Sequence, residues 1–290
     1  MVAPDRDRLR RALGRRGPAA GTGERAAAWR AGEHGGESAF ELRELLQRHL
    51  ARPRPVVELP PGEEVETAAG TYWRRLLRYP LDQRHGDVEL GRGLRLDGAR
   101  LAELARDPSF ADQDPRQCLF FDTETTGLAG GAGTVVFNIG LGWFEDDALV
   151  VEQTFLRDFS EEPALLLAFA ERLRERPVPV SFVGKSFDRH RIAARLAIHK
   201  QRAPILTPRH LDLYHLARRA FRGELPDCRL RTVEQHKLGL RRTDDLPGSE
   251  APIAFLSWLR DRSGEVDRVL EHNRLDVLSV AALLGVLAGR

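Results

Sequence analysis

The sequence contains few of the residues that build disulfide scaffolds, cysteine metal sites or membrane spans. Its only two cysteines, Cys118 and Cys228, show no metal-ligand spacing. No apolar run approaches the roughly 20 residues that a membrane span needs, and the basic N-terminus lacks the apolar stretch of a secretory signal. We therefore expect a soluble protein of the reducing cytoplasm with no membrane partner.

Lysine is also scarce, because Lys185, Lys200 and Lys237 are the only lysines among 45 basic residues. Arginine binds phosphate in a bidentate fork, but such a bias also fits a GC-rich genome, which is the simpler explanation. The formal net charge of +2 does not by itself indicate a nucleic-acid partner. A cluster of catalytic acids would cancel basic surface elsewhere, so local motifs must decide the function.

The composition divides the 290 residues into three parts. Residues 1–35 are rich in Arg, Gly and Ala with little apolar material to bury, which predicts a disordered basic arm. Residues 36–116 form an N-terminal extension of unknown role, with a short helix expected within 38–50. Residues 117–290 have the apolar density of a folded domain, and all the interpretable motifs lie there.

From residue 117 onward, strand and helix patterns alternate. The runs 118–124, 134–144 and 148–156 predict a three-stranded meander, with a hairpin turn at the EDD between the last two. The order βββαβαβα is typical of a ribonuclease H-like fold with a mixed five-stranded sheet flanked by helices, although other α/β folds share such alternation. The remaining elements are predicted as strands at 178–183 and 209–215 and helices at 163–176, 187–200, 213–222, 230–238, 250–262 and 264–289.

Two acids, Asp122 and Glu124, end the first predicted strand in the run FFDTETTGL. Alternate residues of a strand point to the same side, about 6–7 Å apart along the chain. Two neighbouring carboxylates repel unless a cation lies between them, and hard oxygen ligands suit Mg²⁺ or Mn²⁺. The alternative is an exposed strand end with two solvated acids. The apolar residues before the pair and the Thr-Thr-Gly-Leu after it favour a metal site.

This motif resembles the first motif of the DEDD superfamily of 3′-to-5′ exonucleases, which includes polymerase proofreading domains, ribonuclease T and oligoribonuclease. The second motif of that superfamily resembles FVGKSFD at 182–188, where Asp188 begins a helix, and the third resembles EHNRLDVLS at 271–279, which contains Asp276. The C-terminal sequence, from LRTVEQHKLGL through DLPGSEAP to HNRLDVLSV, is most similar to the YprB-like ribonuclease H-like proteins of bacteria. The likeness covers roughly residues 117–288.

The resemblance implies a metal-dependent exonuclease that hydrolyses phosphodiester bonds in single-stranded or 3′-ended DNA or RNA. Two Mg²⁺ or Mn²⁺ ions, about 3.5–4 Å apart, would activate water and stabilise the leaving 3′ oxygen. His272 would take the proton from that water, for which an imidazole is suited near neutral pH. The metal ligands that the resemblance implies are Asp122, Glu124, Asp188 and Asp276.

The sequence departs from the family pattern at two positions. Val183 stands where many members have Asn, which puts the positioning of Asp188 or of the substrate in question. His272 occupies the spacing at which one branch has Tyr, whereas another branch places His one residue further from the last Asp. His272 and Asp276 are four residues apart and would share one helix face. The alternative for His272 is a packed or solvated helix histidine.

Three further residues are candidates for substrate binding: Thr125, Lys185 and Arg274. For the two cations, an ordinary charged helix surface is an equally good interpretation. Asp212 at the fifth predicted strand is more often structural than catalytic. The pairs His210 and His215, or Glu234 and His236, lack a third partner at metal-ligand spacing.

Two other functions stay open at this point. A structure-selective endonuclease of the same fold would use the same acids, and a non-catalytic nucleic-acid-binding module would be a decayed form of the site. Retention of all four acids argues against decay, because unneeded acids in one pocket repel one another. The choice between DNA and RNA depends on contacts with the 2′-OH that no motif here specifies. No motif indicates a protein partner.

Overall fold

A seven-stranded mixed sheet carries the candidate site, with its strands in the order β1-β2-β7-β6-β5-β8-β9. The computed structural model describes residues 56–127, 133–207 and 209–289. The predicted basic arm at 1–35 and the predicted helix within 38–50 lie outside these residues.

The mixed α/β fold predicted from the sequence is confirmed, but the sheet has seven strands rather than five. The five predicted strands are present; β8 pairs in parallel with β5 of the meander, and β9 pairs in parallel with β8. The two additional strands come from the N-terminal extension, because β2 pairs antiparallel with β7 from Trp73↔Phe155 to Pro80↔Ala148. Three arginines interrupt the apolar pattern of β2, which masked it in the sequence. The strands are β1 (Glu63–Thr67), β2 (Gly70–Pro80), β5 (Cys118–Thr125), β6 (Val136–Phe144), β7 (Ala148–Phe155), β8 (Val178–Ser181) and β9 (Leu211–Asp212), with a separate small pair β3 (Arg84–His85) and β4 (Val88–Glu89).

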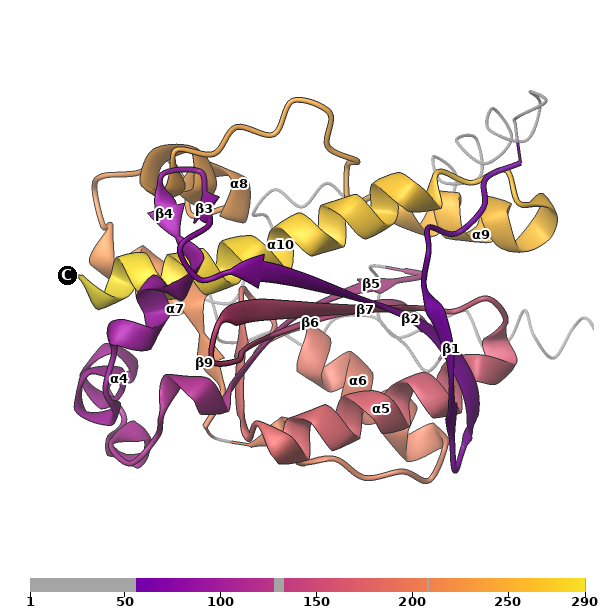
Figure 1. Ribbon diagram of the computed structural model, residues 1–290, viewed down its shortest axis with the longest axis horizontal. Helices are drawn as coiled ribbons and strands as arrows, with labels where there is room; N and C mark the ends of the chain where they lie inside the picture. Colours follow the sequence, from indigo (N-terminus) through magenta and orange to yellow (C-terminus); the bar gives the residue numbers. More distant parts are fainter. Residues whose placement is uncertain (1–55, 128–132, 208, 290) are drawn as a thin grey trace, which may run out of the picture. The chain divides into compact units, whose positions relative to one another are not determined.

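Helices cover both faces of the sheet. The long C-terminal helix α10 lies along one face, whereas α5 and α6 lie on the other (Figure 1). The helix predicted at 230–238 begins as α8 and continues as the π-helical turn η6. The helices are α4 (Gly98–Ala105), α5 (Glu162–Glu175), α6 (Asp188–Ile198), α7 (Leu213–Ala220), α8 (Leu230–Val233), η6 (Glu234–Leu238), α9 (Ala251–Asp261) and α10 (Val266–Ala288), with 3₁₀ turns η1 (Leu90–Arg95), η2 (Pro108–Phe110), η3 (Pro115–Gln117), η4 (Phe159–Glu161) and η5 (Pro204–Leu206).

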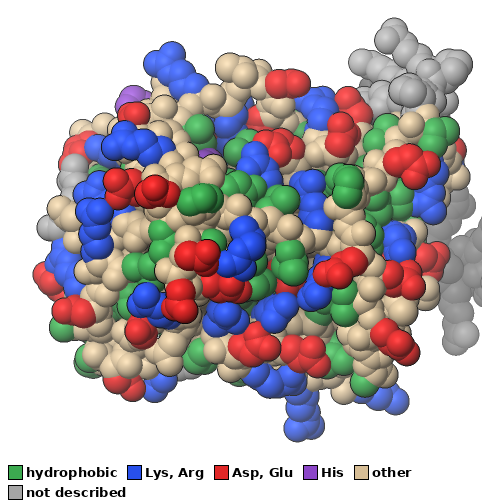
Figure 2. Space-filling model, viewed as in Figure 1, with side chains coloured by type: hydrophobic (Ala, Val, Ile, Leu, Met, Phe, Trp, Pro, Cys, Tyr) green, Lys and Arg blue, Asp and Glu red, His purple; other side chains and the backbone are tan. Residues whose placement is uncertain are grey.

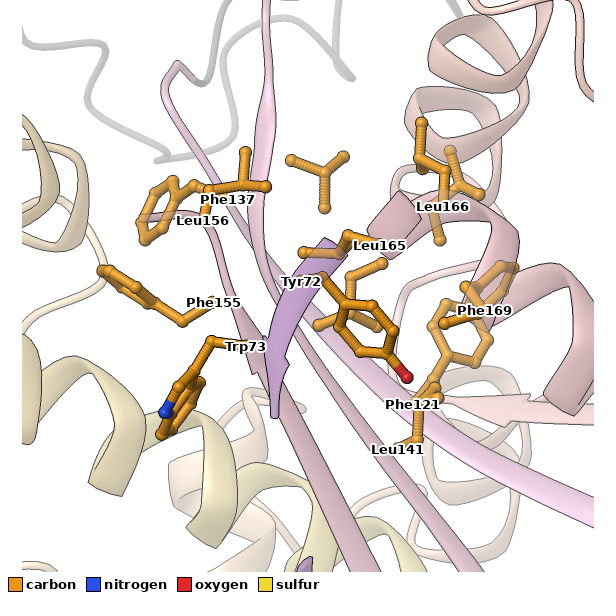
Figure 3. Packing of buried hydrophobic residues seen from close by; sticks show 14 of the residues in the cluster. Tyr72, Trp73, Phe121, Phe137, Leu141, Phe155, Leu156, Leu165, Leu166 and Phe169 are labelled. Atoms are coloured by element: carbon orange, nitrogen blue, oxygen red, sulfur yellow. The ribbon is translucent and has the colours of Figure 1, made fainter. Parts of the chain in front are cut away.

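The alternation of β5 assigns its side chains to two separate cores. Leu119 and Phe121 pack in a cluster with residues of α5, including Phe169 (Figure 3). Cys118 and Phe120 pack in a second cluster with the C-terminal half of α10. Residues 122–125 continue this alternation. Asp122 and Glu124 therefore point toward α10, whereas Thr123 and Thr125 point to the opposite face, on which α6 lies.

Two glycines of β6 allow α10 to approach the sheet closely. A Cβ on Gly140 would come within 2.3 Å of Asn273 Oδ1, and one on Gly142 within 2.7 Å of Val277 Cγ1. Larger residues at these positions would push the helix away, because such distances are far below a normal contact. The close approach brings the polar residues of α10 within reach of the carboxylates of β5.

Among the residues that the structure describes, no helix has the length and apolar character needed to cross a membrane.

Candidate active site

Four acids from three separate segments share one region. Asp122 and Glu124 stand on β5, Asp188 is the first residue of α6, and Asp276 lies on α10. Glu124 and Asp188 are buried, and Asp122 and Asp276 are half-buried. The fold therefore assembles the four acids that the sequence motifs singled out.

The proximity of these acids is visible in their protonation. Burial and the charges of Asp276, Glu124 and Asp188 raise the pKa of Asp122 well above its ordinary value. Burial and the charges of Asp276, Asp188 and Asp245 do the same to the pKa of Glu124. Burial also raises the pKa of Asp188 to about 6, against the opposing effect of a hydrogen bond from Thr123. These carboxylates thus resist ionisation together, as acids sharing one site do.

On the β5 and α6 side, uncharged groups hold the carboxylates. Asn273 Nδ2 donates to Asp122 Oδ2 at 2.9 Å, and Thr123 Oγ1 donates to Asp188 Oδ1 at 2.6 Å. Gln153 Nε2 in turn donates to Asn273 Oδ1 at 2.9 Å, which fixes the orientation of that amide. Each donor engages one carboxylate oxygen.

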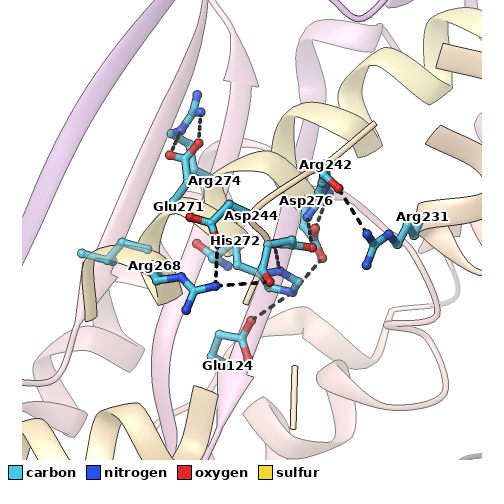
Figure 4. A network of polar contacts seen from close by, with 12 residues as sticks. Glu124, Arg231, Arg242, Asp244, Arg268, Glu271, His272, Arg274 and Asp276 are labelled. Carbon is cyan, nitrogen blue, oxygen red and sulfur yellow. Dashed lines mark hydrogen bonds and ion pairs between the residues drawn. The ribbon is translucent and has the colours of Figure 1, made fainter. Parts of the chain in front are cut away.

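On the α10 side, a buried cation holds the acids. The guanidinium of Arg242, whose side chain is only 4% exposed, pairs with Asp276 Oδ1 at 2.6 Å. It also pairs with the buried Glu234 and lies 3.4 Å from Asp245 Oδ2. Arg242 therefore links one acid of the site to two acids behind it (Figure 4).

The ring of His272 lies between Asp245 on one side and Glu124 and Asp276 on the other (Figure 4). Its Nδ1 is 2.6 Å from Asp245 Oδ1, whereas its Nε2 is 3.8 Å from both Glu124 Oε1 and Asp276 Oδ2. Burial alone would lower the pKa of His272. The hydrogen bond to Asp245 and the charges of Asp276, Asp245 and Asp122 outweigh burial and raise this pKa to about 9. The imidazole is therefore protonated at neutral pH when only these groups surround it.

The donor set fits a hard divalent cation, although it does not form a ready-made cage. Across 56–127, 133–207 and 209–289, no three His, Cys, Asp or Glu side chains are arranged to hold a metal ion. Hydrogen bonds tie one oxygen each of Asp122 and Asp188. Asp276 faces Arg242 through Oδ1 and lies 3.8 Å from His272 Nε2 through Oδ2. Oxygen ligands suit Mg²⁺ or Mn²⁺. Burial raises the pKa values of Asp122, Glu124 and Asp188, neighbouring acids raise them further, and a bound cation would oppose both effects.

The loop before Asp188 is held by Asp212. One carboxylate oxygen of Asp212 accepts from the backbone N–H of Val183 at 2.9 Å and the other from that of Lys185 at 3.0 Å. It also caps α7 through the N–H of Tyr214. Asp212 thus has the structural role that the sequence favoured. Val183 has φ of 67°, a rare conformation for a β-branched residue, and these hydrogen bonds help to hold it there.

The three predicted substrate-binding residues lie in different surroundings. The hydroxyl of Thr125 donates to the carbonyl of Gly127 at 3.2 Å. Lys185 Nζ reaches the carbonyl of His210 at 3.4 Å, on the loop that leads into Asp188. The guanidinium of Arg274 pairs with Glu271 and donates to the hydroxyl of Tyr79 on β2. Arg274 is therefore engaged on the β2 side of α10.

Sequence reasoning missed the residues that support the site. Asp245 stands within the similar stretch DLPGSEAP and Asn273 within the third motif, whereas Arg242 lies between the similar stretches LRTVEQHKLGL and DLPGSEAP. Gln153 and Asn273 are separated by 120 residues, and His272 and Asp245 by 27, so no local periodicity connects them. The one available signal was the pair of glycines in NIGLGWF, which indicates a close approach within a strand.

Three comparisons relate the chain to known proteins. A family model described as the RNase_H superfamily matches residues 119–288. The uncharacterised protein YprB of Bacillus subtilis (strain 168) is 34% identical over 214 residues, which cover 72% of this chain and 51% of that protein. The chain thus spans about half the length of this curated relative. Among solved structures, the family B DNA polymerase of the hyperthermophilic archaeon Pyrobaculum calidifontis matches with a TM-score of 0.46 and 16% identity, over 57% of this chain and 24% of the polymerase.

Proposed function

The chain belongs to the RNase_H superfamily, and on that premise we propose that it is a metal-dependent 3′-to-5′ exonuclease that hydrolyses phosphodiester bonds in DNA or RNA. The observation that carries the proposal is the convergence of Asp122, Glu124, Asp188 and Asp276 in one region. Acids that raise one another's pKa in a partly buried site are a candidate for function, because such strain is otherwise unfavourable. The substrate is single-stranded or 3′-ended nucleic acid.

These four carboxylates would hold Mg²⁺ or Mn²⁺, with two ions at the site. When bound, the ions supply positive charge that activates the attacking water and stabilises the leaving oxygen. Asn273 and Thr123 orient Asp122 and Asp188 through one oxygen each, so the second oxygen of each carboxylate remains available as a ligand.

His272 accepts the proton of the attacking water through Nε2, the nitrogen that faces Glu124 and Asp276. A pKa of about 9 keeps the imidazole protonated at neutral pH, and the negative charges around it help to cause this. Metal ions bound by Asp122 and Asp276 would oppose the effect of these negative charges on His272. The pKa of His272 would then fall toward the range in which a general base works.

The substrate backbone would lie along the loop that contains Lys185, with Thr125 at the end of β5. Figure 2 shows positive and negative side chains interspersed on the face that it views, which agrees with the formal net charge of +2. On the viewed face, substrate positioning would depend on a few local contacts rather than on a broad basic surface. Arg274 is the weakest of the three candidates, because Glu271 already neutralises its charge.

The test is incubation of the purified protein with labelled single-stranded DNA and RNA in the presence of Mn²⁺. Each oligonucleotide is supplied with a free and with a blocked 3′ end, and Asp122→Asn serves as the inactive control. We expect stepwise shortening of the free 3′ ends only. Internal cleavage of the blocked substrates would identify an endonuclease instead, and binding without cleavage would identify a non-catalytic module.

A further inference from the structure

The loop at residues 240–246 places a carboxylate directly behind His272. Asp245 Oδ1 lies 2.6 Å from His272 Nδ1. The opposite ring nitrogen, Nε2, is 3.8 Å from both Glu124 and Asp276. A carboxylate accepts hydrogen bonds, so Nδ1 must carry a proton in this pair, and Nε2 is the nitrogen that can exchange one.

The backbone of this loop is fixed at several points. Arg231 Nη2 donates to the carbonyl of Arg242 at 3.2 Å, and the N–H of Leu240 donates to the carbonyl of Glu234 at 3.0 Å. Arg268 Nη2 donates to the carbonyl of Asp245 at 3.5 Å. These contacts tie residues 240–246 to α8, η6 and α10.

The carboxylate of Asp245 is also held by neighbouring side chains. One oxygen faces His272 Nδ1, and the other is 3.4 Å from the buried Arg242, which is itself anchored by the buried Glu234. Both oxygens of Asp245 are therefore engaged, one by His272 and the other by Arg242. This arrangement differs from that of Asp122 and Asp188, which keep one oxygen clear of these partners.

We infer that Asp245 is the positioning residue for His272. Through Nδ1 it sets the tautomer and the ring orientation, so that Nε2 faces the reacting atoms. The arrangement follows the logic of a carboxylate behind a catalytic histidine, here provided by a loop that precedes the helix carrying the base. The inference rests on the proposed function, in which His272 accepts the proton of the attacking water.

A double-mutant cycle separates positioning from a merely structural ion pair. We expect Asp245→Ala to lower kcat roughly 10²-fold or more, as His272→Ala does, with little change in KM. In the His272→Ala background, Asp245→Ala should have no further effect, because a residue that acts only through another loses its effect when that partner is removed. Asp245→Asn keeps an oxygen acceptor and should retain part of the turnover.

Asp244→Ala is the matched control, because Asp244 is the adjacent acid, its side chain is 89% exposed, and it contacts Arg268 rather than His272. This variant should keep wild-type kcat. Equal loss of turnover in the Asp244 and Asp245 variants, or full turnover in Asp245→Ala, overturns the inference. A further loss caused by Asp245→Ala in the His272→Ala background also overturns it.

A second measurement is independent of turnover. The proton on Nδ1, held in a short hydrogen bond, should give a downfield proton NMR signal that Asp244→Ala keeps and that both Asp245→Ala and His272→Ala lose. Persistence of the signal in Asp245→Ala contradicts the inference. If the wild type cleaves no substrate but the signal depends on Asp245, the proposed function fails while the orientation of the ring by Asp245 is upheld. Asp245→Leu, which has no acceptor but fills the space of the side chain, serves for both measurements if Asp245→Ala does not fold.

Discussion

The buried carboxylates of the acidic site are held by neutral hydrogen-bond donors on one side and by cations on the other. On the β5 and α6 side, neutral Asn273 and Thr123 hold the carboxylates, and the pKa of Asp188 is raised to about 6. On the α10 side, Arg242 and His272 hold the carboxylates. The pKa of Asp245 is lowered there, because the hydrogen bond and charge of His272 and the charge of Arg242 outweigh burial.

The difference gives the two sides different roles. A buried carboxylate without a cation destabilises the folded state at neutral pH, whereas a buried carboxylate with a well-placed cation is destabilising only when its partner is removed. The cation Arg242 and the acids that it contacts therefore form a structural support, which we call the frame. Within the described part of the chain, the carboxylates on the β5 and α6 side lack a cation of this kind and could bind one. Four experiments would break or sharpen this contrast.

Removal of Arg242 should have the largest effect on stability. Arg242→Met keeps the length of the side chain but leaves the buried Glu234, together with Asp276, without this cation. We expect the free energy of unfolding to fall by about 3–5 kcal/mol, as measured by denaturant titration. Arg241→Met, at the exposed neighbouring position, should change it little. Equal stabilities of the two variants would contradict a frame built on Arg242.

Removal of an acid on the other side should have the opposite sign. The folded-state pKa of Asp188 is raised from 3.8 to about 6, so its contribution to stability is fully present below about pH 3.8 and is lost as the pH rises through 6. Asp188→Asn should therefore unfold with a free energy about 1–3 kcal/mol higher than wild type at pH 8, with no gain at pH 3.5. If Asp188 is a metal ligand, as proposed, activity should also fall roughly 10³-fold. If Asp188→Asn is less stable than wild type at pH 8, the ionised carboxylate of Asp188 stabilises the fold, which contradicts this prediction.

Divalent ions should stabilise the protein in a pH-dependent way. Mn²⁺ at 100 times its dissociation constant would add about 2.7 kcal/mol, because it binds the folded state only. At pH 5 its affinity should be about tenfold lower than at pH 8 for each ligand proton that binding must release, since the pKa of Asp188 is about 6. Calorimetric titration at both pH values measures this. In Asp188→Asn the part of the pH dependence due to Asp188 should disappear, and an unchanged profile would exclude Asp188 as a ligand.

The smallest expected effect distinguishes the cations of the two sides. In an Asp122→Asn background, Lys185→Ala should reduce the salt dependence of oligonucleotide binding by about one unit of slope. Arg274→Ala should leave the slope unchanged, because Arg274 is already paired with Glu271. Fluorescence anisotropy across a salt series measures both slopes. An equal reduction in the two variants would show that the ion pair with Glu271 opens in the complex.

Several elements of the fold could be predicted because their signals are local. The apolar run of β5, the meander after it and the helical spacing of α10 appear within short windows of sequence, and the structure has each of them. The strand β2 was not predicted, because its arginines hide an apolar pattern that only its pairing with β7 explains. Local pattern therefore predicted these elements but missed the two strands on one side of the sheet.

The sequence by itself determined which acids stand on which elements, because strand and helix spacings decide which side chains share a face. Only the tertiary structure decided which donor or cation each acid receives. Asn273 reaches Asp122 from 151 residues away, across Gly140, and Arg242 reaches Asp276 from a loop between two other helices. These pairings depend on distances between elements, which packing sets. The pKa of a buried carboxylate depends on those same distances, so the pKa of Asp188 is raised whereas that of Asp245 is lowered.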